Sequence, residues 1–596
     1  MMNNYAEKKE FFLATTALED FWDTSKPIVF LSEACVRYSR SSVWKNLDCR
    51  VFESPLKDRG EFEKSYPFVR DVHERFLETL ANALNSLHSI DKPVKFWRIV
   101  IGPWLMHYVH SIFERFRTLS SVLEAYPNIT TIGLDENDFA VAKDFPNFME
   151  RVFSDIYNLQ LYTKILHLLG KKFDRKSALI TQPFSGECYK THKQNTVKLL
   201  IKKFLKNMSP IVVKNAYFPT PVAERALIRR TKAKVFFDHN HSFSFTETPL
   251  DMPLRESLAE KIKAEKASEF EVLLSKLLAF DMPKIYLEGF SAAEQQSKRQ
   301  GRRPEVIVSS DAWYFDELFK LWAANCALEG TALVGIQHGS NYGICSIIPQ
   351  EEHEIKITSR FYSWGWKPDN APNIKPMPSP RLMSHAQLAA DNNKEGILFP
   401  LNCYPRYFYR YQDLRHYDIY RYFEWQRKFV RALDAAFRKK LTIRPYPATY
   451  GNEIKEELLD IDTTLVFDNP RREFMESLRQ CRLCVCDCLE STFFEALAAN
   501  KPTVLFWDPE IFVVRSEAAP FFKKLHESGI LFYDPPDAAA AISEIYNDVG
   551  KWWLDTQRQQ ARNEFCDRFA VSSPDNMGLW AAEFKELLTQ KKRGIL

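Results

Sequence analysis

A histidine in a glycine-containing segment follows an apolar run near the middle of the chain. The segment QHGSNYG spans residues 337–343 and comes directly after the strand-like run ALVGI. Open α/β sheets bind their ligands at the carboxyl ends of their strands, which is where this segment would lie. Because histidine exchanges a proton near neutral pH, we predict that His338 acts as a general base. The alternative interpretation is a turn histidine that bonds to the backbone.

Two acidic residues shortly after this segment are further candidates for a catalytic base. The sequence EEHE, residues 351–354, contains Glu352 and Glu354. A carboxylate in either position could accept a proton. Acidic residues also stabilise the first turn of a helix, and that interpretation stays open.

An arginine and a tyrosine stand at the end of another strand-like run. The sequence TIRPYP covers residues 442–447. Arg444 offers a forked donor that matches a phosphate group, and Tyr446, beside Pro447, offers a stacking face. The alternative is a surface arginine next to a turn that proline stiffens.

The stretch from Cys481 to Trp507 predicts a strand, a tight turn, a helix and a second strand. Residues 483–486 are apolar, and Ser491 or Thr492 would cap a helix that ends near residue 500. Thr492 to Glu495 fits a capping box. The N–H groups of such a helix start can hold an anion. A well-capped helix in an ordinary α/β domain is the alternative.

Composition places the protein among soluble globular chains of more than one domain. The 596 residues include 81 basic and 77 acidic side chains, so the net charge of +4 indicates no nucleic-acid partner. No apolar run approaches the roughly 20 residues that span a bilayer, and no secretion signal precedes the first strand, so we expect a cytoplasmic protein. The eleven cysteines show neither a disulfide framework nor zinc-ligand spacing.

Familiar nucleotide and metal signatures do not occur in the sequence. It lacks G-x-x-x-x-G-K-[ST], G-x-G-x-x-G and H-E-x-x-H. One D-x-D element, residues 460–462, has the form that holds a metal–nucleotide, but we interpret it as a surface turn. We therefore predict no metal and no cofactor.

Strand-like and helix-like runs alternate along the first half. Residues 1–25 indicate a helical lead-in, and a strand-like run FWRIVIGPWL at 96–105 precedes a helix at 106–126. Further strands are expected at 27–34, 211–218, 234–238, 305–309 and 332–337. This alternation predicts a parallel sheet with helices on both faces. Five prolines between residues 368 and 380 mark a linker or crossover.

The second half repeats the same pattern. Strands are expected at 397–401, 441–444, 464–468, 483–486, 503–507 and 530–533, with helices at 420–440 and 538–549 and a helical tail. The fold class is therefore α/β, with a second doubly wound domain.

One segment before the first sheet combines apolar and basic residues at helical spacing. NTVKLLIKKFLKN, residues 195–207, places apolar side chains on one face and lysines on another. It could contact a membrane surface or an anionic acceptor. A core-packing helix with a solvated lysine face is the alternative.

Several of these segments carry a resemblance to known transferases. RPYP after a strand, followed by ESTFFEALAANKPTVLFW, resembles the donor-nucleotide half of a GT-B glycosyltransferase. QHGSNYG is similar to the His-Gly element of CDP-glycerol glycerophosphotransferases. With FWRIVIGPWL and EEHEIKITSRFYSWGW, the ensemble most resembles transferases encoded with O-antigen and surface-carbohydrate genes, a family distantly related to Kdo transferases.

The resemblance implies two Rossmann-like domains that face a cleft. Residues 1–385 would form the acceptor side and residues 390–540 the donor side, with helices of 541–596 packing back on the first domain. Related enzymes bind a cytidine nucleotide through a Ser-Ser/Thr pair, which Ser491-Thr492 matches, and a His-Pro pair, which Tyr446-Pro447 replaces.

On this basis we expect a cytoplasmic, metal-independent glycosyltransferase of surface-polysaccharide assembly, with a peripheral contact at the inner face of the membrane as one interpretation of residues 195–207. It would use a CMP-activated acidic sugar, Kdo or a nonulosonic acid, and a glycan or lipid-linked acceptor. Glu495 would bond the ribose or cap its helix, and Asp238, in the polar strand end DHNH, could approach the anomeric carbon.

Three alternatives stay open at this point. The first is a diphosphate-linked sugar donor. The second is transfer of a polyol phosphate or glycerophosphate from a CDP-linked donor. The third is a non-catalytic protein that binds nucleotide or carbohydrate, because a fold by itself does not establish chemistry.

Overall fold

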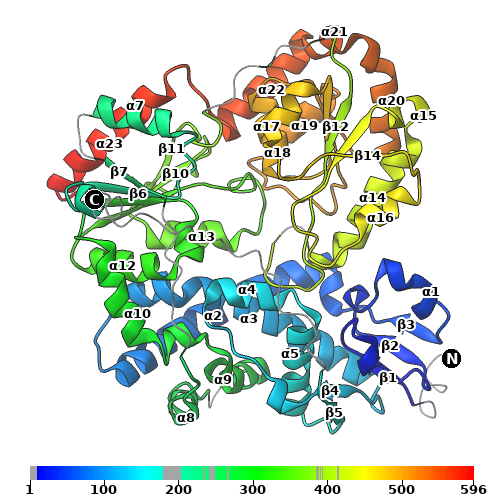
Figure 1. Ribbon diagram of the computed structural model, residues 1–596, viewed down its shortest axis with the longest axis vertical. Helices are drawn as coiled ribbons and strands as arrows, with labels where there is room; N and C mark the ends of the chain where they lie inside the picture. The colour runs from blue at the N-terminus through cyan, green and yellow to red at the C-terminus, as the bar shows by residue number, and fades with distance from the viewer. Residues whose placement is uncertain are drawn as a thin grey trace.

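Two α/β lobes stand on a layer of helices (Figure 1). The computed structural model describes residues 10–178, 203–231, 235–239, 248–264, 267–383, 388, 391, 393–412 and 415–596. Most of the predicted basic helix at 195–207 lies outside these residues. Among the described residues, no helix combines the length and apolarity needed to cross a bilayer.

The helical base carries a small parallel sheet at the beginning of the chain. Strand β2 (Ile28–Phe30) pairs with β1 (Phe12–Ala14) on one side and β3 (Cys49–Val51) on the other. The predicted helical lead-in is therefore wrong over residues 10–25, which hold β1 and a short 3-10 turn. The side chains of Phe12, Leu13 and Ala14 are all buried, which suits a strand covered on both faces more than an amphipathic helix.

Two long helices form the centre of the base. They are α2 (Arg59–His88) and α3 (Val94–Ala125), and they pack along one another. The strand predicted at 96–105 is wrong, because these residues form the first turns of α3. Nearly every side chain from Phe96 to Phe116 is buried, so the start of α3 is enclosed on all faces and residues 96–105 show no helical stripe in the sequence.

Shorter elements complete the base around α2 and α3. They are α1 (Ser41–Trp44), β4 (Ile132–Leu134), α4 (Phe145–Val152), α5 (Asp155–Leu168), β5 (Asp174–Lys176), α8 (Met252–Lys261), α9 (Glu269–Asp281) and α10 (Phe290–Ser297). Residues 145–168 thus form two helices, α4 and α5, which Phe153 and Ser154 separate.

The first lobe contains a six-stranded parallel sheet in the order β11-β10-β9-β8-β6-β7. The strands are β6 (Ile211–Lys214), β7 (Val235–Asp238), β8 (Val306–Ser309), β9 (Ala332–Ile336), β10 (Arg360–Ser363) and β11 (Ile374–Pro376). The helices of this lobe include α7 (Pro221–Thr231), α11 (Ala312–Phe315), α12 (Glu317–Leu328) and α13 (Pro349–Ile357). The chain leaves β6 toward β7 and returns to β8, so a topological switch point lies between β6 and β8.

The second lobe contains another six-stranded parallel sheet, in the order β14-β13-β12-β15-β16-β17. The strands are β12 (Ile397–Pro400), β13 (Leu441–Arg444), β14 (Val466–Phe467), β15 (Leu483–Cys486), β16 (Thr503–Phe506) and β17 (Leu531–Phe532). In chain order this is 3-2-1-4-5-6, the strand order of the Rossmann fold, and its switch point lies between β12 and β15. Two doubly wound α/β lobes therefore confirm the predicted GT-B-like fold class.

Helices cover both faces of the second sheet (Figure 1). They are α14 (Ile419–Ala432), α15 (Ala435–Arg438), α16 (Ile454–Leu459), α17 (Phe474–Gln480), α18 (Ser491–Ala498), α19 (Ala519–Glu527), α20 (Pro535–Ile545), α21 (Val549–Trp553) and α22 (Thr556–Phe569). The buried side chains of Leu483 to Cys486 lie between these layers. Four cysteines of this stretch are free thiols within that core: Cys481, Cys484, Cys486 and Cys488.

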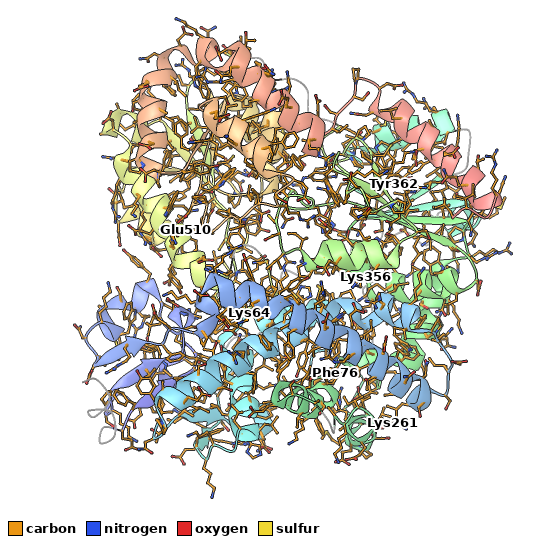
Figure 2. All side chains as sticks on the ribbon, turned by 180° about the vertical axis from the view of Figure 1, so that it is seen from behind. Lys64, Phe76, Lys261, Lys356, Tyr362 and Glu510 are labelled. Atoms are coloured by element: carbon orange, nitrogen blue, oxygen red, sulfur yellow. The ribbon has the colours of Figure 1, made fainter. Side chains whose placement is uncertain are left out.

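The last helix, α23 (Asn576–Lys592), leaves the second lobe and packs against α7 of the first. Tyr362, at the end of β10, donates a 2.6 Å hydrogen bond to Glu583, and its ring meets Trp580 at 5.1 Å between centroids. Figure 2 shows Tyr362 at the junction of this sheet and the helix. The C-terminal helix, which follows the second lobe in the chain, thus packs on the first lobe.

Candidate active site

A cavity of about 380 Å³ lies where the two sheets and the helical base meet. The first lobe contributes Tyr314, Phe315, His338, Asn341, Cys345 and Gln350, and the base contributes His107, Met149 and Phe153. The second lobe contributes Asn402, Cys403, Tyr404, Pro405, Tyr409, Arg410, Gln412, Tyr446, Tyr450, Leu489, Glu490 and Phe512. Loops after the carboxyl ends of strands from both sheets therefore line one cleft.

His338 follows β9 and is backed by a buried carboxyl. Its Nδ1 lies 3.5 Å from Oε1 of Glu354 on α13 and, among the residues that the structure describes, has no hydrogen-bond partner. The Tyr342 hydroxyl donates to the same Oε1 at 2.7 Å, and the Tyr342 ring lies 5.4 Å from the imidazole. The imidazole is thereby oriented with one nitrogen toward Glu354 while the ring lines the cavity.

Burial disfavours the charged form of both of these groups. It lowers the pKa of His338 to about 4, and the nearby guanidinium groups of Arg410 and Arg381 act in the same direction. Burial also raises the pKa of Glu354 well above its ordinary value, although the hydrogen bond from Tyr342 opposes the shift. At neutral pH the imidazole is free to accept a proton, which is the state that a general base requires.

The wall opposite His338 carries an acidic group on the second sheet. Glu490 follows β15 and accepts a 3.2 Å hydrogen bond from the Tyr404 hydroxyl, which in turn accepts from Asn402 at 2.8 Å. Burial raises the pKa of Glu490, while the Tyr404 hydrogen bond and Arg410 oppose the rise. These residues come from the loops after β12 and β15, on either side of the switch point.

Arg410 is a cation that lines this cavity. Its Nε donates to Gln412 at 2.9 Å, and its guanidinium lies 5.0 Å from the centre of the Tyr409 ring. The same guanidinium lowers the pKa of His338 and opposes the raised pKa of Glu490. Its positive charge therefore acts on groups of both cavity walls. An anionic ligand in the cavity would therefore be attracted to Arg410.

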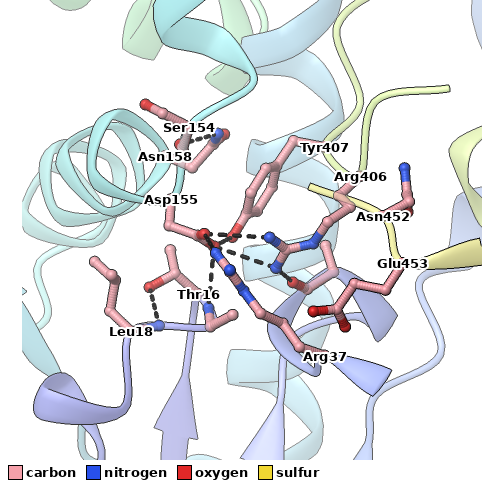
Figure 3. Close-up of polar contacts among 12 residues, drawn as sticks. Thr16, Leu18, Arg37, Ser154, Asp155, Asn158, Arg406, Tyr407, Asn452 and Glu453 are labelled. Atoms are coloured by element: carbon pink, nitrogen blue, oxygen red, sulfur yellow. Dashed lines mark hydrogen bonds and ion pairs between the residues drawn. The ribbon is translucent and has the colours of Figure 1, made fainter. Parts of the chain in front are cut away.

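The loop that carries Tyr404, Tyr409 and Arg410 is fixed to the base by a buried ionic network (Figure 3). Arg406 Nη1 lies 3.2 Å from Oδ2 of Asp155, the first residue of α5, and the Tyr407 hydroxyl donates to the same carboxylate. Burial by itself would raise the pKa of Asp155, but the neighbouring guanidiniums hold it below its ordinary value. The loop conformation therefore depends on a residue about 250 positions away.

One end of the cavity is aromatic. The Tyr446 and Tyr450 rings lie 6.1 Å apart, and Phe153 of the base meets Tyr450 edge-to-face at 5.1 Å. Phe153 also meets Tyr409 at 5.2 Å. Tyr446 is 42% exposed, so part of its surface is open to a ligand. Such a group of rings suits the face of a nucleobase or a sugar.

Direct contacts join the two lobes beside the cavity. The Ser340 hydroxyl donates to the carbonyl of Leu489 at 3.1 Å. Arg381 Nε donates to Oε1 of Glu495, on α18, at 2.9 Å. Glu495 is therefore held by a cation from the segment between the sheets. Ser340, two residues after His338, therefore contacts Leu489, two residues before α18.

The capping box predicted for α18 is wrong. The N-cap is Glu490, no side chain caps the first turn, and Ser491 and Thr492 are the first two helical residues. Glu490 is engaged by Tyr404 and Glu495 by Arg381, so neither carboxylate turns back to the helix start. Ser491 and Thr492 follow the cavity residue Glu490 directly but are not among the residues that line the cavity.

Two predicted carboxylates lie away from the cavity. Glu352 accepts a 2.7 Å hydrogen bond from Tyr66 on the far side of α13. Asp238, at the end of β7, accepts from Lys206 at 2.6 Å. Neither lines the cavity, whereas Glu354 lies behind His338.

Arg444 is the last residue of β13 and contacts the loop that follows β14. Its Nη1 lies 2.9 Å from Oδ2 of Asp468 and bonds the carbonyl of Asn469 at 3.1 Å. Arg444 and Pro447 do not line the cavity, although Tyr446 between them does. The arginine therefore positions the loop after β14 in this structure.

The loop after β12 belongs to the site but was not predicted from the sequence. The run CYPRYFYRY, residues 403–411, supplies Tyr404, Tyr409 and Arg410 to the cavity. Four tyrosines and two arginines directly after a buried strand, in the first connection of a doubly wound domain, were the available signal. The contribution of His107 and Phe153 from the helical base had no such signal.

A second cavity, of about 330 Å³, lies at the switch point between β6 and β8 in the six-stranded sheet of the first lobe. It is lined by Val213, Asn215, Ala216, Tyr217, Phe218, Glu224, Phe237, His239 and Asp311. The Tyr217 hydroxyl donates to Asp311 at 2.8 Å, and His239 Nε2 lies 2.8 Å from Glu224. Tyr217 also faces Arg381, whose guanidinium lies 5.8 Å from the ring centre. Aromatic and hydrogen-bonding groups thus meet at the carboxyl end of this sheet.

Comparison with known families identifies the chain. The family model described as LIC12162 family transferase matches residues 11–584. The chain belongs to the LIC12162 family transferases. It is therefore a transferase. No curated protein matches it.

Several solved structures resemble this LIC12162 family transferase at low similarity. A Staphylococcus aureus MnaA–UDP co-structure has 10% identity and a TM-score of 0.34, covering 65% of this chain and 96% of that one. An E. coli trehalose-6-phosphate structure with UDP-2-fluoro glucose has 12% identity and a TM-score of 0.34, covering 64% and 99%. A Thermobaculum terrenum O-GlcNAc transferase has 10% identity and a TM-score of 0.34, covering 88% and 98%. The GT-B-like fold class is therefore inferred from the strand order of the two six-stranded sheets and not from these matches.

Proposed function

We propose that this LIC12162 family transferase moves a sugar from a nucleotide donor to a glycan or lipid-linked acceptor. One observation carries the proposal: a single cavity joins the switch-point loops of the Rossmann-like second sheet to His338 on the first. A nucleotide on the second lobe would then present its sugar to a neutral imidazole. Transfer onto a hydroxyl needs such a base to remove the hydroxyl proton.

The donor is assigned to the second-lobe side of the cavity. The nucleobase would stack on Tyr446, and its phosphate would lie between Arg410 and the N-terminus of α18, where Ser491 and Thr492 leave backbone N–H groups without side-chain caps. Arg444 would act through the loop after β14, and Pro447 would stiffen the turn below Tyr446. Glu495, bound to Arg381, would fix the helix start instead of bonding ribose.

The acceptor is assigned to the first lobe. His338 would take the proton from the acceptor hydroxyl, and Glu354 would orient the imidazole through Nδ1. The second cavity, with Asn215 and Asp311, would hold the acceptor's saccharide rings through hydrogen bonds and the Tyr217 face. Asp238 and Glu352 are placed outside the reacting centre because their partners lie elsewhere.

A CMP-activated acidic sugar, Kdo or a nonulosonic acid, is the proposed donor. The supporting residues are the Ser491-Thr492 pair and the cation Arg410, which would also attract a sugar carboxylate. We assign residues 1–385 to the acceptor side, 390–540 to the donor side and 541–596 to C-terminal helices, of which α23 packs on the first lobe. The enzyme would work in the cytoplasm, at the inner face of the membrane, in surface-polysaccharide assembly.

A thermal-shift panel of CMP, CDP, UDP and GDP tests the donor. A nucleotide at a hundred times its dissociation constant stabilises the fold by about 2.7 kcal/mol, which a melting curve resolves. The cytidine nucleotides are expected to give the largest shift. A larger shift with UDP or GDP would replace the cytidine assignment, and no shift with any nucleotide would remove the donor site. Tight CDP binding with release of a polyol phosphate instead of a sugar would identify the alternative transferase.

A further inference from the structure

Three large apolar side chains project from the surface just before the first sheet. Residues 203–207 are helical, and Phe204, Leu205 and Met208 are 65%, 51% and 48% exposed. On the opposite side of this turn, Lys206 is buried, bonds Asp238 and lies 4.6 Å from the centre of the Trp322 ring. One face is therefore anchored to the sheet while the apolar face points outward.

A basic segment lies directly beside these apolar side chains. The Arg302 backbone N–H donates to the Asn207 side chain at 2.8 Å, and the Glu305 N–H donates to the Pro210 carbonyl at 2.9 Å. These bonds hold residues 298–303, the sequence KRQGRR, against the turn. Lys298, Arg299 and Arg302 are exposed. The three apolar residues and these three basic residues are called the Phe204 surface below.

The nearby acidic group is already engaged. Arg303 Nε lies 3.9 Å from Oε2 of Glu329, which is the acid paired with residues 298–303 in the described part of the chain. Lys298 and Arg299 form the 3-10 turn that follows α10, which packs on α12 beside the first sheet (Figure 1). The Phe204 surface thus presents a positive field around an apolar centre.

We propose that the Phe204 surface docks the protein on a bilayer that contains anionic lipids. Basic side chains are attracted to anionic headgroups, while exposed aromatic and aliphatic side chains enter the boundary between headgroups and acyl chains. A nucleic acid would use the charges but leave Phe204 and Leu205 in water, and an apolar protein partner would not need the surrounding cations. The combination of both features favours the membrane.

The proposal goes beyond sugar transfer, and its test measures binding without turnover. The full-length protein is sedimented with vesicles of phosphatidylcholine and with vesicles that also contain phosphatidylglycerol. Binding is expected with the anionic vesicles, with a decline at high salt because surface charges are screened. Failure of donor binding would leave this result unaffected, and failure of vesicle binding would leave the donor site unaffected.

Two pairs of matched variants separate charge from apolar contact. Lys298→Gln with Arg299→Gln should weaken partitioning about 25-fold, since each basic residue near a membrane contributes about fivefold. Lys523→Gln with Lys524→Gln removes the same charge from exposed positions on α19 of the second lobe and should change partitioning less than twofold. Equal losses in both variants would show non-specific charge binding and would overturn the assigned surface.

The apolar contribution is tested at fixed charge. Phe204→Ser with Leu205→Ser should weaken vesicle binding at least about tenfold, whereas Leu554→Ser, at a 60% exposed leucine of the second lobe, should not. Phe204, Leu205 and Leu554 are all exposed, so the serine variants should keep the melting temperature of the natural protein. No binding of the natural protein to anionic vesicles would overturn the proposal. Unchanged binding of the serine variant, or loss of self-association in that variant by light scattering, would equally overturn it.

Discussion

Replacement of His338 gives the sharpest test of the proposed chemistry. The His338→Ala variant should lose about 10²–10⁴-fold in turnover, which is the contribution of a positioned general base. Its nucleotide affinity should stay within a few fold, because His338 lies on the first lobe and the donor is assigned to the second. Donor consumption and calorimetric nucleotide affinity are measured side by side on folded protein.

The pH dependence of the natural enzyme follows from the buried state of this histidine. A pKa lowered from 6.5 to about 4 disfavours the imidazolium by about 3 kcal/mol, so the ring is neutral throughout the range from pH 5 to 8. The acid limb of kcat/KM should therefore fall near pH 4 and not near 6.5. The limb is read from initial rates of donor consumption across that range.

Glu354 provides the matched control. Because burial raises the pKa of Glu354 well above its ordinary value and so favours the uncharged carboxyl, Glu354→Gln keeps the shape of that form. That variant should keep turnover within about tenfold, while Glu354→Ala should lose more by freeing the imidazole. Loss of nucleotide binding in His338→Ala, or an acid limb at 6.5, would refute the assigned role. A loss of about 10³-fold in Glu354→Gln would show that the carboxylate acts as an ion.

Three further outcomes follow from the structure. Tyr446→Ala should weaken nucleotide binding by about 1–3 kcal/mol, whereas Tyr446→Phe should not, because stacking needs only the ring. Equal losses of nucleotide affinity in the two variants, measured by calorimetry, would rule out the stacking role. Asp155→Ala should destabilise the fold by about 3–5 kcal/mol in denaturant unfolding, because Arg406 would be left buried without its carboxylate, and a loss below 1 kcal/mol would contradict this. The free energy of unfolding should fall below pH 6.5, because His107 and His416 are protonated in the unfolded chain while their pKa values in the folded protein are about 3. Each histidine should lower the free energy of unfolding by about 2 kcal/mol at pH 5. A melting temperature that stays constant from pH 7 to 5 would contradict this.

The sequence by itself determined the strands of both α/β lobes. Runs such as ALVGI and LCVC are short, apolar and bounded by turn residues, and parallel strands covered on both faces need that composition. The same reasoning failed at residues 96–105, because a helix buried on every side is equally apolar. Local pattern identifies burial more reliably than it distinguishes a strand from a fully enclosed helix.

The sequence also located parts of the site. His338 follows a strand of the first lobe and Tyr446 a strand of the second, each at the carboxyl-end edge of its own sheet, and both line the cavity. The capping box at Thr492 was not realised, because Glu495 is bound instead by Arg381, more than a hundred residues earlier. A local signature therefore lost to a contact that no local pattern contains.

Tertiary structure alone decided how the cavity is assembled. Arg410 and Tyr404 take their places because Arg406, on the same loop, is bonded to Asp155 of the helical base. The Nδ1 of His338 meets Glu354 because α13 packs beside β9, and the two lobes meet through Ser340 and Leu489. Each of these contacts joins residues whose separation in the chain bears no relation to their separation in space. Hydrophobic periodicity is set by neighbours within a few residues, whereas the orientation of a buried charge is set by whichever distant partner stabilises it.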